Sequence, residues 1–231
     1  MAFVPEELWP KLVVVRCGVD LAEFAPAEVA PAESAPSSAR AERSAGAPLR
    51  ILTVGRVDPM KGTVLLLQAL AQLRERGLAA VLTVVGDGPS RAKAAEIADR
   101  LGIGELVTWA GAVGQDRIRD FYANCDVFCL PSFAEGVPIV LMEAMAMEVP
   151  VVANAITGIV ELVDDGVSGL LVRPGRLDQL TDALARLLAD PALRSAIGRA
   201  GRARLAAEYD LHRNARRLAE LFADDQRRTR D

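Results

Sequence analysis

The sequence predicts an α/β fold with a doubly wound, Rossmann-like parallel sheet. After Pro48, short runs of Val, Ile and Leu alternate with helical stretches. The runs are apolar throughout, which is typical of parallel strands covered by helices on both faces. The chain has 231 residues, 51% of them hydrophobic, and is long enough to bury a sizeable core. Sheets of this kind bind ligands beyond the carboxyl ends of their strands, so the loops that follow the strands are the informative ones.

Four regions follow one another along the chain. We expect residues 1–24 to be the remnant of a connection between domains, with a buried strand over Lys11–Arg16 and a turn at Cys17-Gly-Val-Asp20. Residues 25–48 are rich in Ala, Pro, Ser and Glu without an apolar period, which predicts a flexible linker or surface loop. We expect residues 49–208 to form the Rossmann-like domain and residues 209–231 to form a C-terminal helix and tail.

The elements of the domain follow from the apolar runs and the helical spacing between them. We expect strands over Leu49–Val54, Val81–Val85, Leu106–Trp109, Val127–Leu130, Val149–Ala153 and Gly169–Val172. We expect helical segments over Thr63–Arg76, Ser90–Leu101, Gln115–Ala123, Val137–Met147, Ile159–Val163, Leu177–Leu188, Pro191–Glu208 and Leu211–Phe222.

Composition argues against several functional classes. A formal net charge of −4 provides no basic footprint for a nucleic acid or an anionic membrane. No signal peptide is visible, and no charge-free apolar run reaches the roughly 18–20 residues of a membrane span. The three cysteines are scattered, and a single histidine leaves a zinc site short of ligands. We therefore expect a cytoplasmic protein with reduced thiols and no transmembrane segment.

The stretch from Pro131 to Val152 holds the main candidate site. The helix expected there is apolar on every face, which predicts burial, yet it contains Glu143. A buried carboxylate needs a partner or a polar cleft. Glu135 lies in the loop before this helix, and the turn Glu135-Gly136-Val137-Pro138 leaves backbone N–H groups free to bind an anion. Two carboxylates beside an anion site suit a ligand with phosphates and hydroxyls. The alternative is a surface carboxylate and a core carboxylate paired with an arginine.

A second candidate follows the first strand of the domain. The segment Gly55-Arg-Val-Asp-Pro-Met-Lys61-Gly62 places the cations Arg56 and Lys61 at a strand's carboxyl end. Arginine suits bidentate phosphate contact and lysine acts as a point charge. The segment does not match a Walker loop. The alternative is a solvated turn with surface charges.

The remaining motifs are less specific. Gly86-Asp-Gly-Pro89 favours a tight turn, since a lone GxG is not a dinucleotide fingerprint. Small residues in Trp109-Ala-Gly-Ala-Val113 leave room for a flat group or form a plain loop. Asp164-Asp165-Gly166 is typical of a turn, and His212 is expected on the solvated side of the last helix.

These motifs together resemble the C-terminal, donor-binding half of a family 4 retaining glycosyltransferase of the GT-B architecture (glycosyltransferase group 1). The similarity is carried, in order, by CGVDLAEF, TVGRVDPMKG, VVGDGP, VTWAGAV, DVFCLPSFAEGVPIVLMEAMAMEVPVVA and GIVELVDDGVSGLLV. Glu135 and Glu143 match the family's E-x7-E signature. The asparagine usual before GVD is Cys17 here, and the Pro/Ala stretch is longer than usual.

The resemblance implies a role for each residue. Arg56 and Lys61 would bind the donor diphosphate and stabilise the leaving group, Glu135 would bind sugar hydroxyls, and Glu143 would accept from the ribose diol. Pro138 has no N–H, so the backbone contact near it must come from Val137 or Ile139. The catalytic set is Glu135, Arg56 and Lys61. The donor-binding set is Gly55, Arg56, Lys61, Gly86, Val113, Glu135, Gly136, Val137, Pro138, Ile139 and Glu143, with Val113 beside the base.

The resemblance also implies an activity and a partner. A hexose would pass from a UDP- or GDP-sugar to a glycan, lipid or small-molecule acceptor, without a metal or other cofactor. The family's preceding domain, which supplies the acceptor site, would come in cis or from a separate subunit, and could add peripheral contact with the inner membrane face. Alone, this chain would bind donor but catalyse weakly or not at all. The alternatives are a catalytically silent nucleotide-binding module and a GT-B-like sugar-nucleotide epimerase domain. The base, the sugar and the acceptor stay open.

Overall fold

A computed structural model describes residues 4–26 and 47–228, with side chains through residue 223. Its centre is one sheet of six parallel strands in the order β3-β2-β1-β4-β5-β6. The strands are β1 (Leu49–Val54), β2 (Ala80–Val85), β3 (Val107–Gly111), β4 (Val127–Leu130), β5 (Val151–Asn154) and β6 (Leu170–Val172). The predicted doubly wound α/β fold is confirmed.

Strand β1 lies at the centre and pairs with β2 on one side and β4 on the other. The chain winds outward from β1 to β3, then returns to the middle and winds outward again from β4 to β6. The carboxyl ends of β1 and β4 therefore mark the switch point, where such sheets hold their ligands. The two loops that carry the candidate residues start at these two ends.

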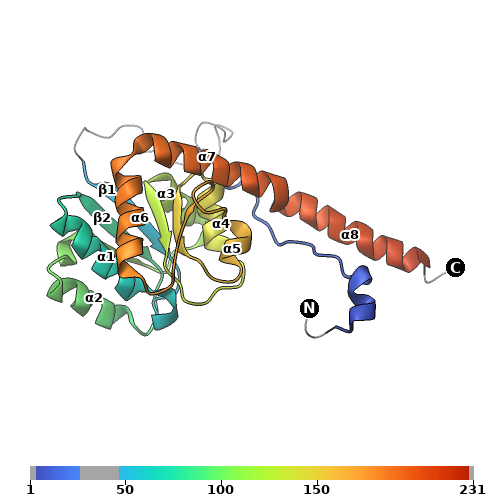
Figure 1. Ribbon diagram of the computed structural model, residues 1–231, viewed down its shortest axis with the longest axis horizontal. Helices are drawn as coiled ribbons and strands as arrows, with labels where there is room; N and C mark the ends of the chain where they lie inside the picture. Colours follow the sequence, from blue (N-terminus) through green and yellow to red (C-terminus); the bar gives the residue numbers. More distant parts are fainter. Residues whose placement is uncertain (1–3, 27–46, 229–231) are drawn as a thin grey trace.

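Helices cover both faces of the sheet (Figure 1). One face is covered by α1 (Thr63–Glu75), α2 (Arg91–Arg100) and α6 (Leu177–Ala189). The other is covered by α3 (Gln115–Ala123), α4 (Ile139–Ala146) and α5 (Ile159–Leu162), with α7 (Pro191–Glu208) packed on α4. The chain also has α8 (Leu211–Arg228) and the 3-10 helices η1 (Glu6–Lys11), η2 (Pro59–Lys61) and η3 (Gly104–Leu106).

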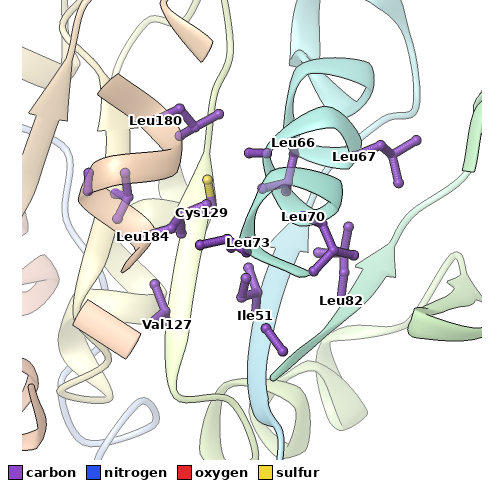
Figure 2. Packing of buried hydrophobic residues seen from close by; sticks show 14 of the residues in the cluster. Ile51, Leu66, Leu67, Leu70, Leu73, Leu82, Val127, Cys129, Leu180 and Leu184 are labelled. Atoms are coloured by element: carbon purple, nitrogen blue, oxygen red, sulfur yellow. The ribbon is translucent and has the colours of Figure 1, made fainter. Parts of the chain in front are cut away.

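The strands supply alternate side chains to two separate core clusters. Ile51 and Cys129 lie in the cluster under α1 and α6, whereas Leu52 and Phe128 lie in the cluster under α3 and α4. Figure 2 shows the first cluster, where leucines of α1 and α6 meet the sheet. The strands thus present mostly apolar side chains to both faces of the sheet, which explains the Val, Ile and Leu runs in the sequence.

The expected elements of residues 49–222 all form, and every boundary except the end of α8 lies within two residues of the expected one. Helix α4 begins at Ile139 rather than Val137, because a residue before proline is disfavoured in the helical region and Pro138 itself is extended (φ −75°, ψ 115°). Helix α8 continues past Phe222 to Arg228.

The strand expected over Lys11–Arg16 is wrong. Lys11 ends η1, and the residues after it pair with no strand of the sheet. Leu12, Val13 and Val14 are 41%, 49% and 69% exposed. An apolar run forms a buried strand only where a neighbouring strand satisfies its backbone, and none lies beside this one among the described residues. The expected linker at 25–48 falls almost entirely on residues 27–46, outside the described part of the chain.

Two segments from opposite ends of the chain are joined. Val19 forms an isolated parallel bridge with Asp210. Its N–H donates to Tyr209 O (3.0 Å) and its carbonyl accepts from Leu211 N (3.2 Å). Gly18 allows this approach, since a Cβ there would lie 2.4 Å from Tyr209 O. The segment that precedes the domain therefore rests on the turn between α7 and α8.

Helix α8 leaves the body of the molecule (Figure 1). Its apolar residues Leu211, Leu218 and Phe222 are exposed. Within residues 4–26 and 47–228, no helix combines the length and apolar character needed to cross a bilayer.

All three cysteines lie in the described part of the chain and are free thiols, as expected. Cys125 and Cys129 are buried and Cys17 is exposed. Burial raises the pKa of the Cys129 thiol above its usual range, so this sulfur stays protonated.

Candidate functional site

The loops after β1 and β4 lie against each other at the switch point. Gly62 has a left-handed backbone (φ +68°), and a Cβ there would lie 2.1 Å from Pro131 O. The N–H of Phe133 donates to Met60 O at 2.7 Å. Only glycine allows both the positive φ and the short distance to Pro131 O at position 62, so this residue sets how closely the two loops approach.

The β1 loop is shaped by a capped helical turn. The Asp58 carboxylate accepts from the N–H groups of Met60 (2.9 Å) and Lys61 (3.2 Å), and Pro59 opens η2. A capping residue followed by proline is the usual start of a helical turn. Here it fixes the position of the Lys61 backbone. Arg56 is 68% exposed, with Nε 3.7 Å from Asp58 Oδ2.

The predicted cation and the predicted sugar-binding carboxylate meet directly. Lys61 Nζ lies 2.7 Å from Glu135 Oε1, and the two side chains are 28% and 11% exposed. The residues are far apart in the sequence, and the contact follows from the neighbouring positions of β1 and β4. The structure thus places one positive and one negative group at the start of α4.

The N-terminus of α4 offers backbone donors at the same place. The first N–H to bond within the helix is that of Leu141, which donates to Pro138 O. The amides of Gly136, Val137 and Ile139 come before it and have no acceptor among the described residues. Gly158 packs on this turn, since a Cβ there would lie 1.5 Å from Gly136 O. Such an arrangement of free N–H groups suits an anion.

Glu143 is buried, as expected, at 4% exposure. Its partner is a tyrosine rather than an arginine: the Tyr122 hydroxyl on α3 donates to Glu143 Oε2 at 2.7 Å. Burial raises the pKa of Glu143 above its ordinary value and the negative charge of Glu23 adds to this, while the hydrogen bond from Tyr122 acts in the opposite direction. Burial and the neighbouring carboxylate hold the pKa of Tyr122 well above its usual range, so its hydroxyl remains a donor.

Three further glycine and valine positions lie at the ends of β1, β2 and β3. The N–H of Gly55 donates to Val85 O (2.9 Å), and the N–H of Gly86 donates to Gly111 O (2.7 Å). Gly86 has φ +125°, and a Cβ there would lie 1.9 Å from Gly55 O. Val113 is partly buried against the core cluster under α3 and α4, and no described interaction joins it to Lys61 or Glu135.

The sequence did not single out three polar residues that shape the site. Tyr122 binds Glu143, and the fully buried Asn154 donates from Nδ2 to Pro131 O (2.8 Å) and Ser132 O (3.0 Å). Ser132 is also fully buried. The sequence did contain a signal for Asn154: it is the one polar residue of β5 (Val-Val-Ala-Asn), and it stands at the carboxyl end, where ligands bind.

The other polar motifs lie apart from this site. Asp165 accepts from Leu171 N (2.8 Å) and belongs to a turn, as expected. His212 is mostly exposed, with Nε2 2.9 Å from Asp20 Oδ2. Within the part of the chain that the structure describes, no three His, Cys, Asp or Glu side chains are grouped so as to hold a metal ion.

Comparison with known proteins connects this geometry to one family. The family model described as "Glycosyl transferases group 1" matches residues 36–204. A curated relative, D-inositol 3-phosphate glycosyltransferase of Kribbella flavida, is 36% identical over 82% of this chain and 46% of its own length. The chain spans about half the length of the curated relatives that it matches.

Solved structures share the fold. Sucrose-phosphate synthase from Thermosynechococcus elongatus matches 92% of this chain and 52% of its own, with a TM-score of 0.77 and 30% identity. Anabaena HepE, solved in complex with UDP-glucose, matches 77% of this chain and 49% of its own, with a TM-score of 0.71 and 28% identity.

Proposed function

The chain belongs to the glycosyl transferases group 1 family, and we propose that it is the donor-binding half of a retaining glycosyltransferase that transfers a hexose from a UDP- or GDP-sugar. The observation that carries this proposal is the convergence of Lys61, Glu135 and the free amides of α4 at the switch point. A cation and N–H donors suit a diphosphate, and a carboxylate beside them suits sugar hydroxyls.

In the proposed reaction, the bond between the anomeric carbon and the β-phosphate oxygen breaks, and its electron pair stays on the nucleoside diphosphate. An acceptor hydroxyl oxygen forms the new bond to the same carbon, and its proton passes to the departing diphosphate. Lys61 and Arg56 stabilise the charge that develops on the departing diphosphate, which is the kind of electrostatic contribution that dominates such transfers. Glu135 holds the sugar by its hydroxyls.

The nucleoside would lie along α4 and the ends of β1 to β3. We propose that Glu143 accepts from the ribose diol, since Tyr122 occupies only its Oε2. Gly55 and Gly86 have backbone conformations that favour glycine (φ +153° and +125°), and the absence of a side chain at these positions would leave room for the donor. Val113 would lie beside the base. The reaction is proposed to need no metal ion, and measuring donor affinity with and without EDTA tests that point.

A second domain would complete the enzyme. The matched relatives are about twice as long as this chain. Helix α8 presents Leu211, Leu218 and Phe222 to solvent, and residues 12–14, which precede the domain in the sequence, are also exposed. We propose that the acceptor-binding domain, in cis or as a separate subunit, packs on these apolar surfaces and brings the acceptor to the donor.

Donor titration tests the proposal. Calorimetry with UDP, GDP, UDP-glucose and GDP-mannose is expected to show binding of one nucleotide series by the folded chain. Glu143→Gln keeps the side chain's size but removes the anion, so the variant should lose the preference for UDP over 2′-deoxy-UDP, or for GDP over 2′-deoxy-GDP. A folded sample that binds no nucleotide would refute the proposal. Assaying the chain together with its acceptor domain separates transfer from epimerisation and from silent binding.

A further inference from the structure

Strand β5 ends on a side chain that reaches across to the neighbouring loop. Asn154 is fully buried, and its Nδ2 donates to the carbonyls of Pro131 (2.8 Å) and Ser132 (3.0 Å). These are the first two residues after β4. The same loop continues directly to Glu135, so the amide holds the base of the segment that carries the sugar-binding carboxylate.

The contact requires a side chain with two N–H donors. One NH2 group serves two carbonyl oxygens, which an aspartate or an alanine cannot do. Within the described part of the chain, Asn154 Oδ1 and Ser132 Oγ have no hydrogen-bond partner. A buried amide that uses only half of its bonding capacity carries a desolvation cost. Its polar contacts all go to the loop, which points to loop geometry as its role.

Two other contacts hold the same loop from the side of β1. Gly62 lies against Pro131 O, and Phe133 N donates to Met60 O at 2.7 Å. The carbonyl of Pro131 is therefore touched both by Asn154 from β5 and by the turn that carries Lys61. Displacing this carbonyl would change the separation of Lys61 and Glu135.

We propose that Asn154 is a positioning residue for the donor site: its two hydrogen bonds fix the β4 loop so that Glu135 meets the donor sugar next to Lys61. Asn154 itself does not touch the donor. The part that concerns the sugar rests on the proposed function, whereas the part that concerns the loop rests on the geometry alone.

A double-mutant cycle tests the link to the sugar. Asn154→Ala and Glu135→Ala are each expected to lower the affinity for UDP-glucose relative to UDP, or for GDP-mannose relative to GDP, by about tenfold. The double variant should lose no more than Glu135→Ala alone, because both changes remove the same contact. Asn154→Asp, which keeps the volume but not the donors, should match Asn154→Ala. Additive losses, or an equal loss for nucleotide and sugar nucleotide, would overturn the proposal.

Thr181→Val is the matched control. Thr181 is fully buried on α6, and its hydroxyl also makes two contacts, with Gln72 Oε1 (2.9 Å) on α1 and Leu177 O (2.8 Å) on α6, rather than with the β4 loop. This variant should leave the affinity ratio unchanged.

Hydrogen exchange of the Phe133 amide provides a measure that needs no ligand. Asn154→Ala should speed its exchange and Thr181→Val should not. If the wild-type chain binds no nucleotide, or binds nucleotide and sugar nucleotide equally, the proposed function fails and this exchange decides the loop claim. Unchanged exchange in Asn154→Ala would then refute it.

Discussion

Removing the Tyr122 hydroxyl should expose the cost of burying Glu143. Tyr122 is fully buried and donates to Glu143 Oε2 at 2.7 Å. Tyr122→Phe keeps the aromatic ring, which packs against Phe24 and Phe128, so it opens almost no cavity. The change is confined to one oxygen atom and leaves a buried carboxylate without its tyrosine donor.

The magnitude follows from the charge of the acceptor. A hydrogen bond to a charged group contributes about 1.5–3 kcal/mol, against about 0.5–1.5 kcal/mol for one between neutral groups. Because Glu143 is only 4% exposed, water compensates little of the loss. At neutral pH we expect Tyr122→Phe to lower the free energy of unfolding by about 1.5–3 kcal/mol.

The dependence on pH has a definite sign. Burial raises the pKa of Glu143 in the folded protein above the ordinary 4.5, so between these values the folded state holds a proton that the unfolded state has lost. Stability therefore falls as the pH rises through this window. The hydrogen bond from Tyr122 lowers the pKa of Glu143, so its loss raises this pKa further. The pH range over which stability falls then extends to higher pH. The cost of Tyr122→Phe should grow as the pH rises and shrink below 4.5.

Urea unfolding, measured from below pH 4.5 up to neutral pH, tests this reasoning. Tyr209→Phe is the matched control, because Tyr209 is equally buried but its hydroxyl donates to a neutral carbonyl, Glu161 O (3.0 Å), and accepts from Arg16 Nε (3.2 Å), whose charge does not change over this range of pH. The loss in free energy of unfolding caused by Tyr209→Phe should not change with pH. If Tyr122→Phe costs the same at every pH, or no more than Tyr209→Phe, then Glu143 is not held as a buried anion by this hydroxyl.

Three further outcomes are expected. Lys61→Met should weaken UDP or GDP binding by about 10- to 100-fold in calorimetry, since it removes a charge-assisted contact to the diphosphate. Gly158→Ala should lower the free energy of unfolding, measured in urea, because φ is +84° and the new Cβ would lie 1.5 Å from a carbonyl oxygen. Backbone strain alone costs about 1–3 kcal/mol, and the clash should add to that cost. Phe222→Ala on α8 should change the thermal stability of this chain by less than about 0.5 kcal/mol, since its side chain is exposed.

Each of these variants has a partner that isolates its cause. Arg56→Met should weaken binding less than Lys61→Met, because Arg56 is more exposed; the reverse order would mean that Arg56 is the main diphosphate ligand. Gly166→Ala carries the strain of φ +75° without a neighbour within 4 Å, so a cost equal to that of Gly158→Ala would contradict the clash. Leu205→Ala, at a buried site, should cost about 2–5 kcal/mol, and a comparable cost for Phe222→Ala would show that α8 is packed in solution.

The fold could be predicted because each strand expected within residues 49–172 also had a neighbour in the sheet. The run Leu-Val-Val-Val after Lys11 has the same local signature as β1 and yet forms no strand among the described residues. An apolar run in the sequence indicates that a segment can be buried, but not that another strand lies beside it to pair with. The start of α4 shows the opposite case. The hydrophobic period alone placed the start at Val137, whereas the local effect of Pro138 on the backbone moves it to Ile139.

The candidate site was predictable in its position but not in its pairings. Lys61 and Glu135 were both assigned to the donor site, but their direct contact depends on the approach permitted by Gly62. The burial of Glu143 likewise demanded a partner without identifying it. Tyr122 lies on a different helix, and no spacing rule within one element connects the two residues.

The bridge between Val19 and Asp210 also bears on how the chain folds. It closes a loop of nearly the whole chain, and the closure entropy of such a loop is lost before the contact returns any free energy. The βα units between these residues make mostly shorter-range contacts and can assemble first. We therefore expect docking of the first segment on the turn between α7 and α8 to be the last step of folding, and we expect this segment to open first under mild denaturant, as hydrogen exchange would measure.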